Sequence, residues 1–94
     1  MYDIIWRKAA EVDRDCIFSY IAQDDPIAAA ELDAEFDVKT EMAARQPEMY
    51  RYGRVEGTRE IVVRHNYTLI YRIEEASETI VVLRLLHVAQ KWPR

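Results

Sequence analysis

The segment Thr79–His87 constrains the fold of this chain more than any other. Its sequence, TIVVLRLLH, is apolar at nearly every position. A strand whose two alternating sets of side chains are both apolar needs cover on both faces. The segment therefore predicts a strand in the centre of a sheet. Strict alternation divides its side chains into two sets, Ile80, Val82, Arg84 and Leu86 on one face and Val81, Leu83, Leu85 and His87 on the other.

Further strands are predicted on either side of this segment in the sequence. Glu60–Arg64 and Tyr67–Ile73 read as two strands joined by a turn at His65-Asn66, and residues 74–78 form a polar loop before the last strand. A short apolar strand, Tyr2–Trp6, begins the chain. On the second of the paired strands, alternation predicts that four side chains share one face, namely Tyr67, Leu69, Tyr71 and Ile73.

The region between the first strand and Pro47 has the periodicity of helices. From about Lys8 to Ala22, apolar residues recur at spacings of four and five and predict one buried stripe. The members of that stripe are Val12, Cys16, Ile17, Tyr20 and Ile21. As part of the stripe, Cys16 is expected to pack in the core and not to act as a nucleophile.

A second helix is predicted from Pro26 to about Arg45. Asp25 can cap it, Pro26 suits the first helical position, and Pro47 lies just beyond its end. Its core residues are expected to be Ala28, Leu32, Phe36 and Ala43, and its outer face is acidic, with Glu31, Asp33, Glu35, Asp37 and Glu41. The short connection predicts an antiparallel helical hairpin. The order β-α-α-β-β-β gives an α+β fold in which this hairpin packs on one face of a small antiparallel sheet.

Length and composition set the class of protein. A chain of 94 residues with 50% apolar residues is one domain with a real core, so we treat residues 1–94 as a single domain. No apolar run approaches the roughly 20 residues needed to span a bilayer, and the N-terminus is charged too early for a secretory signal. A single cysteine fits a reducing compartment, so a cytoplasmic location is expected.

The net charge of -4 is unevenly divided along the chain. Residues 1–49 contain 12 acidic and 5 basic residues, whereas residues 50–94 contain 5 acidic and 8 basic residues. Most of the acidic residues are expected to coat solvated helix faces. The basic half is expected to meet an acidic partner.

Several kinds of enzyme site are excluded. The two histidines, His65 and His87, lack cysteines or a third ligand at metal-site spacing. Two glycines cannot build a glycine-rich phosphate loop, and the two serines, Ser19 and Ser77, do not lie in a nucleophile turn. We therefore expect neither a metal nor another cofactor.

The remaining chemical signal is a set of basic side chains on the strands: Arg59, Arg64, Arg72, Arg84 and His87. Cleavage of RNA at the 2′-hydroxyl needs a general base, an acid and a cation for the charge on phosphorus, and this set together with Glu60 contains such groups. The alternative is structural, with the arginines paired to nearby carboxylates such as Glu56 and Glu60 and the histidine satisfied at the end of a strand. Spacing alone leaves both interpretations open.

Several pieces of the sequence together resemble the RelE/ParE superfamily of bacterial toxins. The helical piece DxxxIxxYIAxDxPxAA comprises Asp13, Ile17, Tyr20-Ile21-Ala22, Asp24, Pro26 and Ala28-Ala29. The strand pieces are GTRE, NYxxxYR and LRxLHxxxxWP, and the resemblance covers nearly the whole chain. It implies the toxin of a type II toxin–antitoxin system, with the α+β fold described above.

The superfamily includes two mechanisms. RelE-like members cut messenger RNA on the ribosome, which would make Arg59, Arg64, Arg84 and His87 catalytic. ParE-like members poison DNA gyrase by binding and carry out no covalent chemistry. Few lysines, the tail Lys91-Trp92-Pro93 in place of a terminal tyrosine, and the negative net charge favour the ParE-like branch, and hence a protein that is not an enzyme. A degenerate toxin that keeps only antitoxin binding is a third possibility.

The resemblance also implies partners. A cognate antitoxin is expected to cover apolar surface of the toxin and to contact operator DNA on its behalf, and DNA gyrase, or alternatively the ribosome and its messenger RNA, is the expected target. No membrane is implied. The residues expected to contact the target or the antitoxin are Arg59, Arg64, Arg72, Arg84, His87 and Trp92.

Overall fold

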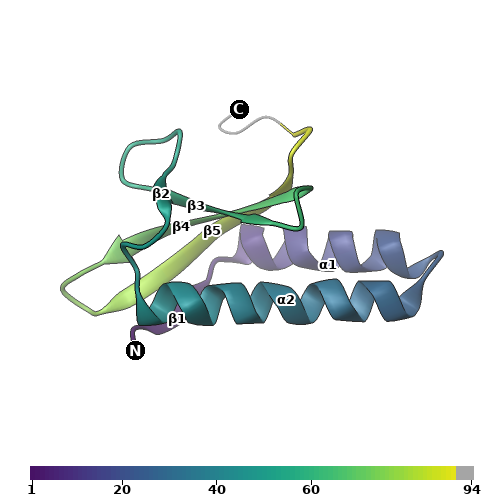
Figure 1. Cartoon of the computed structure of the whole chain (residues 1–94), viewed down its shortest axis with the longest axis horizontal. Helices are drawn as coiled ribbons and strands as arrows, with labels where there is room; N and C mark the ends of the chain where they lie inside the picture. Colours follow the sequence, from purple (N-terminus) through teal and green to yellow (C-terminus); the bar gives the residue numbers. More distant parts are fainter. Residues whose placement is uncertain (91–94) are drawn as a thin grey trace.

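A computed structural model describes residues 1–90, which fold into a five-stranded sheet with two helices packed on one face (Figure 1). Along the chain the elements are β1 (Asp3–Trp6), α1 (Lys8–Ala22), α2 (Pro26–Arg45), β2 (Arg51–Tyr52), β3 (Arg59–Val63), β4 (Tyr67–Glu74) and β5 (Thr79–His87). The α+β class and the helical hairpin on one face are confirmed. None of the helices within the described range is long and apolar enough to cross a membrane.

The strand order is β1-β5-β4-β3-β2, which confirms that Thr79–His87 is a central strand. The sheet is mixed and not antiparallel throughout, because β1 runs parallel to β5, with Asp3 opposite Thr79 and Trp6 opposite Val82. Parallel neighbours need a long crossover, and the helical hairpin supplies part of it. The short strand β2, which the sequence did not predict, pairs with the start of β3.

A bulge in β5 changes which side chains face the helices. Ile70 of β4 lies opposite Arg84 and Tyr71 lies opposite Val82, so Leu83 has no residue opposite it. Beyond this bulge the two faces exchange, and Leu85 joins the core in place of Arg84. The prediction that Ile80, Val82, Arg84 and Leu86 share one face is wrong for this reason.

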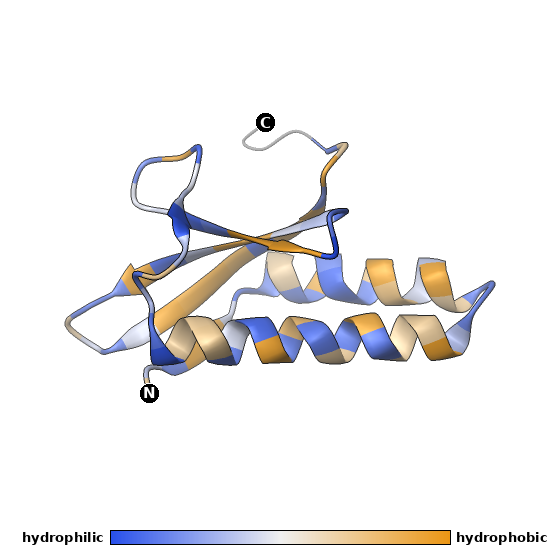
Figure 2. Ribbon diagram, in the orientation of Figure 1, coloured by the Kyte–Doolittle hydropathy of each residue, from blue (hydrophilic) through white to orange (hydrophobic). Residues whose placement is uncertain are grey.

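The core lies between the sheet and the hairpin. From α2, Leu32, Phe36 and Ala43 are buried as predicted, whereas Ala28 is partly exposed and its neighbour Ala29 is buried. The strand face predicted for β4 is confirmed, since Leu69 and Tyr71 belong to the core cluster and Tyr67 and Ile73 pack against it. The central strands are predominantly apolar, and both helices alternate between apolar and polar residues (Figure 2).

The stripe predicted for α1 is only half correct. Ile17 and Ile21 pack against the core, but Val12 and Tyr20 are 47% and 76% exposed, and Cys16 is exposed as well. Residues 12, 16 and 20 form a row that is rotated away from the row of 17 and 21 on a helix of 3.6 residues per turn. The expectation that Cys16 packs in the core is therefore wrong.

Capping explains where α2 begins. The carboxylate of Asp25 accepts a hydrogen bond from the backbone N–H of Ala28 at 3.0 Å, and Pro26 is the first helical residue, as predicted. At the other end, the backbone N–H of Tyr2 donates to the carbonyl of Ala44 at 2.8 Å. The hairpin is thus fixed to the sheet near β1 by a backbone hydrogen bond.

Candidate functional site

Arg84 lies at the part of β5 that extends beyond the end of β1. Its Nε and Nη2 donate to the two carboxylate oxygens of Asp13 on α1, at 2.7 and 3.0 Å. One of those oxygens also accepts a hydrogen bond from the backbone N–H of Leu85 at 2.9 Å. A neighbouring strand would accept this hydrogen bond if the sheet continued here, so the Asp13 carboxylate takes the place of that strand. We call Asp13, Arg84 and Leu85 the Asp13 clamp. The hydrogen bond to Asp13 raises the pKa of Arg84, which stays charged.

Arg59 is held by the segment that leads into β2. Its Nη1 donates to the carbonyl oxygens of Tyr50 at 2.7 Å and Glu48 at 3.2 Å. The guanidinium carbon lies 4.3 Å from the centre of the Tyr52 ring, a cation–π contact. These contacts fix the entry to β2 on the start of β3.

Glu60 forms the other half of this corner. Its side chain is 3% exposed and accepts the backbone N–H of Arg54 at 3.0 Å, and the guanidinium of Arg51 lies 3.3 Å away. Glu60 therefore pairs with nearby arginines as the structural interpretation predicted, but with Arg51 and Arg54. The GTRE piece is in this way a folded corner of the β2–β3 hairpin, with Gly57 at φ 83° and the Thr58 hydroxyl donating to the Val55 carbonyl at 2.6 Å.

Replacing Gly53 by alanine is expected to destabilise this corner by about 2 kcal/mol, because a Cβ there would overlap with the Thr58 hydroxyl oxygen. Thr58 is buried and cannot turn away freely. Gly57→Ala is the matched comparison, since a Cβ at Gly57 meets nothing and only the left-handed backbone costs about 1 kcal/mol. Urea unfolding of both variants measures the difference. Equal losses would contradict the steric explanation.

Arg64 and Arg72 lie near opposite ends of β4. Arg64 lies in the turn before it, at φ 50°, and pairs with Glu35 of α2 at 2.7 Å. Arg72 lies near its far end and pairs with Glu74 at 3.1 Å. Both side chains are partly exposed, so these ion pairs contribute little to stability.

His87 ends β5 beside the turn that contains Arg64. Its ring stands edge-on to the Tyr67 ring, with centroids 5.5 Å apart, and Tyr67 in turn contacts Phe36 of α2 at 6.0 Å. The Nδ1 atom accepts the backbone N–H of Ala89 at 3.1 Å. His87 is thus exposed but oriented. Trp92, predicted as a contact residue, lies outside the described residues.

The predicted site residues therefore do not form one cluster. Of the described set, only Arg64 and His87 lie at the same end of the sheet, because Val63 and His87 both lie opposite Tyr67. Arg64, Arg72 and Arg84 pair with carboxylates of the chain, and Arg59 with carbonyls. The groups that RNA cleavage requires around one phosphate are dispersed in this arrangement.

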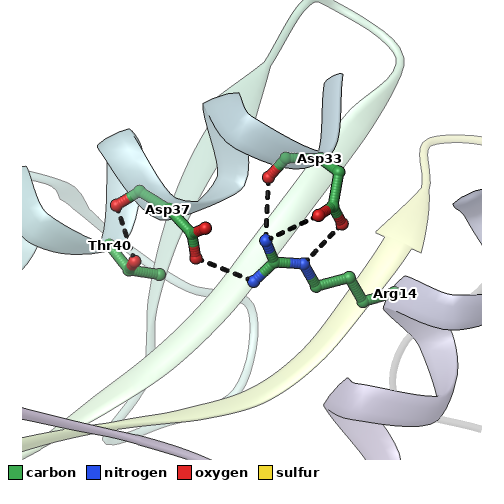
Figure 3. Close-up of polar contacts among 4 residues, drawn as sticks. All are labelled: Arg14, Asp33, Asp37 and Thr40. Atoms are coloured by element: carbon green, nitrogen blue, oxygen red, sulfur yellow. Dashed lines mark hydrogen bonds and ion pairs between the residues drawn. The ribbon is translucent and has the colours of Figure 1, made fainter. Parts of the chain in front are cut away.

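One charged centre was missed by the sequence prediction. Arg14 of α1 is 17% exposed and bonds Asp33 at 2.6 Å and Asp37 at 2.9 Å, and its Nη2 also donates to the Asp33 carbonyl (Figure 3). Its guanidinium lies 4.9 Å from the Trp6 ring centre and 5.9 Å from that of Phe36. Burial acts to lower the pKa of Arg14, but the bonds to the two carboxylates outweigh it and raise the pKa. The available signal was two acids four residues apart on the outer face of α2.

Comparisons with known proteins identify the family of this chain. A family model described as the ParE toxin of type II toxin–antitoxin systems, parDE, matches residues 4–92. "Putative toxin Y4kP" of Sinorhizobium fredii (strain NBRC 101917 / NGR234) is 36% identical over 92 residues, which cover 97% of this chain and 93% of that protein.

Solved structures show the same fold. A chain of the chromosomal ParDE system from P. aeruginosa superposes with a TM-score of 0.76 at 20% identity, covering 93% of this chain and 96% of that one. The isolated E. coli RelE toxin gives 0.70 at 13% identity, with 98% and 89% covered. A chain of the RelBE2 toxin–antitoxin complex from Mycobacterium tuberculosis gives 0.63 at 26% identity, with 95% and 93% covered.

Proposed function

Because this chain belongs to the ParE toxin family of type II toxin–antitoxin systems, we propose that it arrests growth by binding DNA gyrase and that a cognate antitoxin neutralises it. In this proposal the toxin acts in the cytoplasm by stabilising a gyrase–DNA complex, and it carries out no covalent chemistry. Operator DNA is reached only through the antitoxin.

The observation that carries the proposal is the dispersal of the basic side chains. Arg72 and Arg84 are bonded to carboxylates at separate places on the sheet, and Arg59 is bonded to backbone carbonyls. Stabilising the charge on a cleaved phosphate needs cations that converge on one point. A protein that binds its target has no such requirement.

The antitoxin part of the proposal is supported by the solved relatives. The M. tuberculosis RelBE2 structure is a toxin–antitoxin complex, and so is the intact E. coli RelBE structure, which matches this chain with a TM-score of 0.67. A small α+β toxin with exposed apolar residues on both helices offers surface for a partner segment that orders on binding.

The test compares two assays on the same purified toxin. We expect it to inhibit DNA supercoiling by gyrase and to increase cleaved gyrase–DNA complexes, while a cell-free translation reaction continues and its messenger RNA stays intact. Adding the antitoxin encoded beside the toxin should restore supercoiling. Arrest of translation with supercoiling unchanged would contradict the gyrase proposal.

A ribosome-dependent endoribonuclease is the second candidate, and it rests on the end of the sheet where Arg64 and His87 lie together. The His87 side chain is exposed, and its ring is held in place by the hydrogen bond from Ala89 and by the contact with the Tyr67 ring. A group that transfers a proton to or from a substrate needs both this access and this fixed orientation. On this reading His87→Ala abolishes messenger RNA cleavage, whereas His65→Ala, in the adjacent turn, retains it. On the gyrase reading His87→Ala leaves translation unaffected. Normal growth on expression without antitoxin would instead indicate a degenerate toxin.

A further inference from the structure

The hairpin has exposed apolar residues on the side that faces away from the core. On α2 they recur at helical spacing, and Ile27 and Val38 are 73% and 52% exposed. On α1, Phe18 is 39% exposed. These residues lie in two exposed rows that also contain acids: the α2 stripe, which consists of Ile27, Ala30, Ala34, Val38 and Glu41, and the α1 stripe, which consists of Glu11, Asp15, Phe18 and Ala22.

The Arg14 ion pairs place these two stripes side by side. Asp37, which bonds Arg14, is three residues after Ala34 on α2, and Phe18 is four residues after Arg14 on α1. Because the two helices are antiparallel, Phe18 lies beside the turn of α2 that contains Ala30. The two stripes therefore border one groove, which we call the hairpin groove.

The end of the hairpin groove nearest β1 is a hollow with a volume of about 420 Å³. Its walls carry three carboxylates and one aromatic ring together with two basic side chains, and its lining residues are Trp6, Lys8, Glu11, Arg14, Asp15 and Asp37. Acids therefore border the groove at this end, and apolar side chains border it further along.

Negative charge on the hairpin is less compensated than positive charge on the sheet. Arg64 and Arg84 of the sheet half are paired with hairpin carboxylates. Within residues 1–90, the carboxylates of Glu11, Asp15 and Glu41 have no hydrogen-bond or ion-pair partner. Residues 1–49 contain 12 acidic against 5 basic residues. A partner that binds this face gains from carrying the opposite charge.

We propose that the hairpin groove is a docking surface for a basic amphipathic helix of a protein partner. The apolar side of that helix lies over Phe18, Ala34 and Val38, where the alanine lets it approach closely, and its lysines or arginines meet the acids at the groove margins. This inference rests on the proposed function, in which the toxin works through protein partners. It reverses the expectation that partner acids bind the arginines of the sheet, because those arginines already bond groups of their own chain.

The test uses two synthetic amphipathic helices as probes, one built of leucine and lysine and the other of leucine and glutamate. Fluorescence anisotropy of labelled peptides measures their binding to the full toxin. We expect the lysine peptide to bind and to weaken at high salt, and the glutamate peptide to bind at least tenfold more weakly. Equal binding of the two peptides would overturn the proposal.

Two variants with the same change in charge locate the site. Ala34→Arg puts a bulky cation into the groove and should weaken the lysine peptide at least tenfold, whereas Ala76→Arg, in the exposed turn after β4, should leave the affinity within twofold. Both sites are exposed, so both variants should fold, which circular dichroism can verify. If the two variants weaken binding equally, the attraction is unspecific and the groove is not the site. Neither measurement involves gyrase, so a failure of the gyrase proposal would be seen separately in the supercoiling assay.

Discussion

Asp13→Ala is expected to lower the free energy of unfolding by about 3 kcal/mol, which corresponds to a fall in Tm of roughly 12–24 °C for a domain of this size. The change removes both bonds from Arg84 and leaves the backbone N–H of Leu85 without its acceptor. The side chain of Asp13 is 15% exposed, so water replaces these bonds poorly. Thermal and urea unfolding measure the loss.

Two further variants separate the parts of the Asp13 clamp. Asp13→Asn keeps an oxygen for the Leu85 N–H but loses the charge, so we expect about half of the destabilisation. Asp15→Ala, on the exposed side of the same helix, should change stability by less than about 0.5 kcal/mol. A loss for Asp13→Ala no larger than that for Asp15→Ala would show that the clamp does not stabilise the fold.

Arg14→Ala is expected to cost about 2–3 kcal/mol, for two separate reasons. The bonds to the side chain and carbonyl of Asp33 are partly buried, and the guanidinium also covers the rings of Trp6 and Phe36. The pair with Asp37, whose side chain is 61% exposed, should contribute little to this value. Chemical unfolding at low and high salt measures the total and its electrostatic share.

Arg14→Met and Arg7→Ala are the controls for this prediction. Methionine keeps most of the packing over the rings and removes the charge, so its loss should be smaller than that of alanine. Arg7 is exposed and precedes α1, so Arg7→Ala should be close to neutral. If Arg14→Met were as damaging as Arg14→Ala, the charge alone would account for the effect.

Local signals in the sequence were sufficient for the long elements. Apolar periodicity, the Asp25-Pro26 start and Pro47 place both helices, and the alternation from Tyr67 to Ile73 gives the correct inner face of β4. They were insufficient for β2, because two residues cannot show a period. They were also insufficient for the parallel pairing of β1, which depends on which strand lies beside it once the hairpin has formed.

The candidate site was predicted less well, because the partner of each arginine comes from a distant part of the chain. Arg84 bonds a residue 71 positions away, and Arg64 bonds one 29 positions away. Nearby carboxylates were the expected partners. Within residues 1–90, this pattern holds only for Glu60, with Arg51 and Arg54, and for Arg72, with Glu74. The chemistry of the residues was readable from the sequence, whereas their placement needed the tertiary structure.

The bulge at Leu83 has a consequence for comparing relatives of this protein. Deleting that one residue would remove the bulge and leave Leu85 and His87 on the face toward the helices, whereas a strand of the same length without the bulge would turn both to the opposite face. A homologue that keeps every residue of this strand but pairs it without the bulge would therefore present its final histidine on the opposite side of the sheet, even with the motif letters preserved. Alignments of these toxins should accordingly be matched by strand face when residues after the bulge are compared.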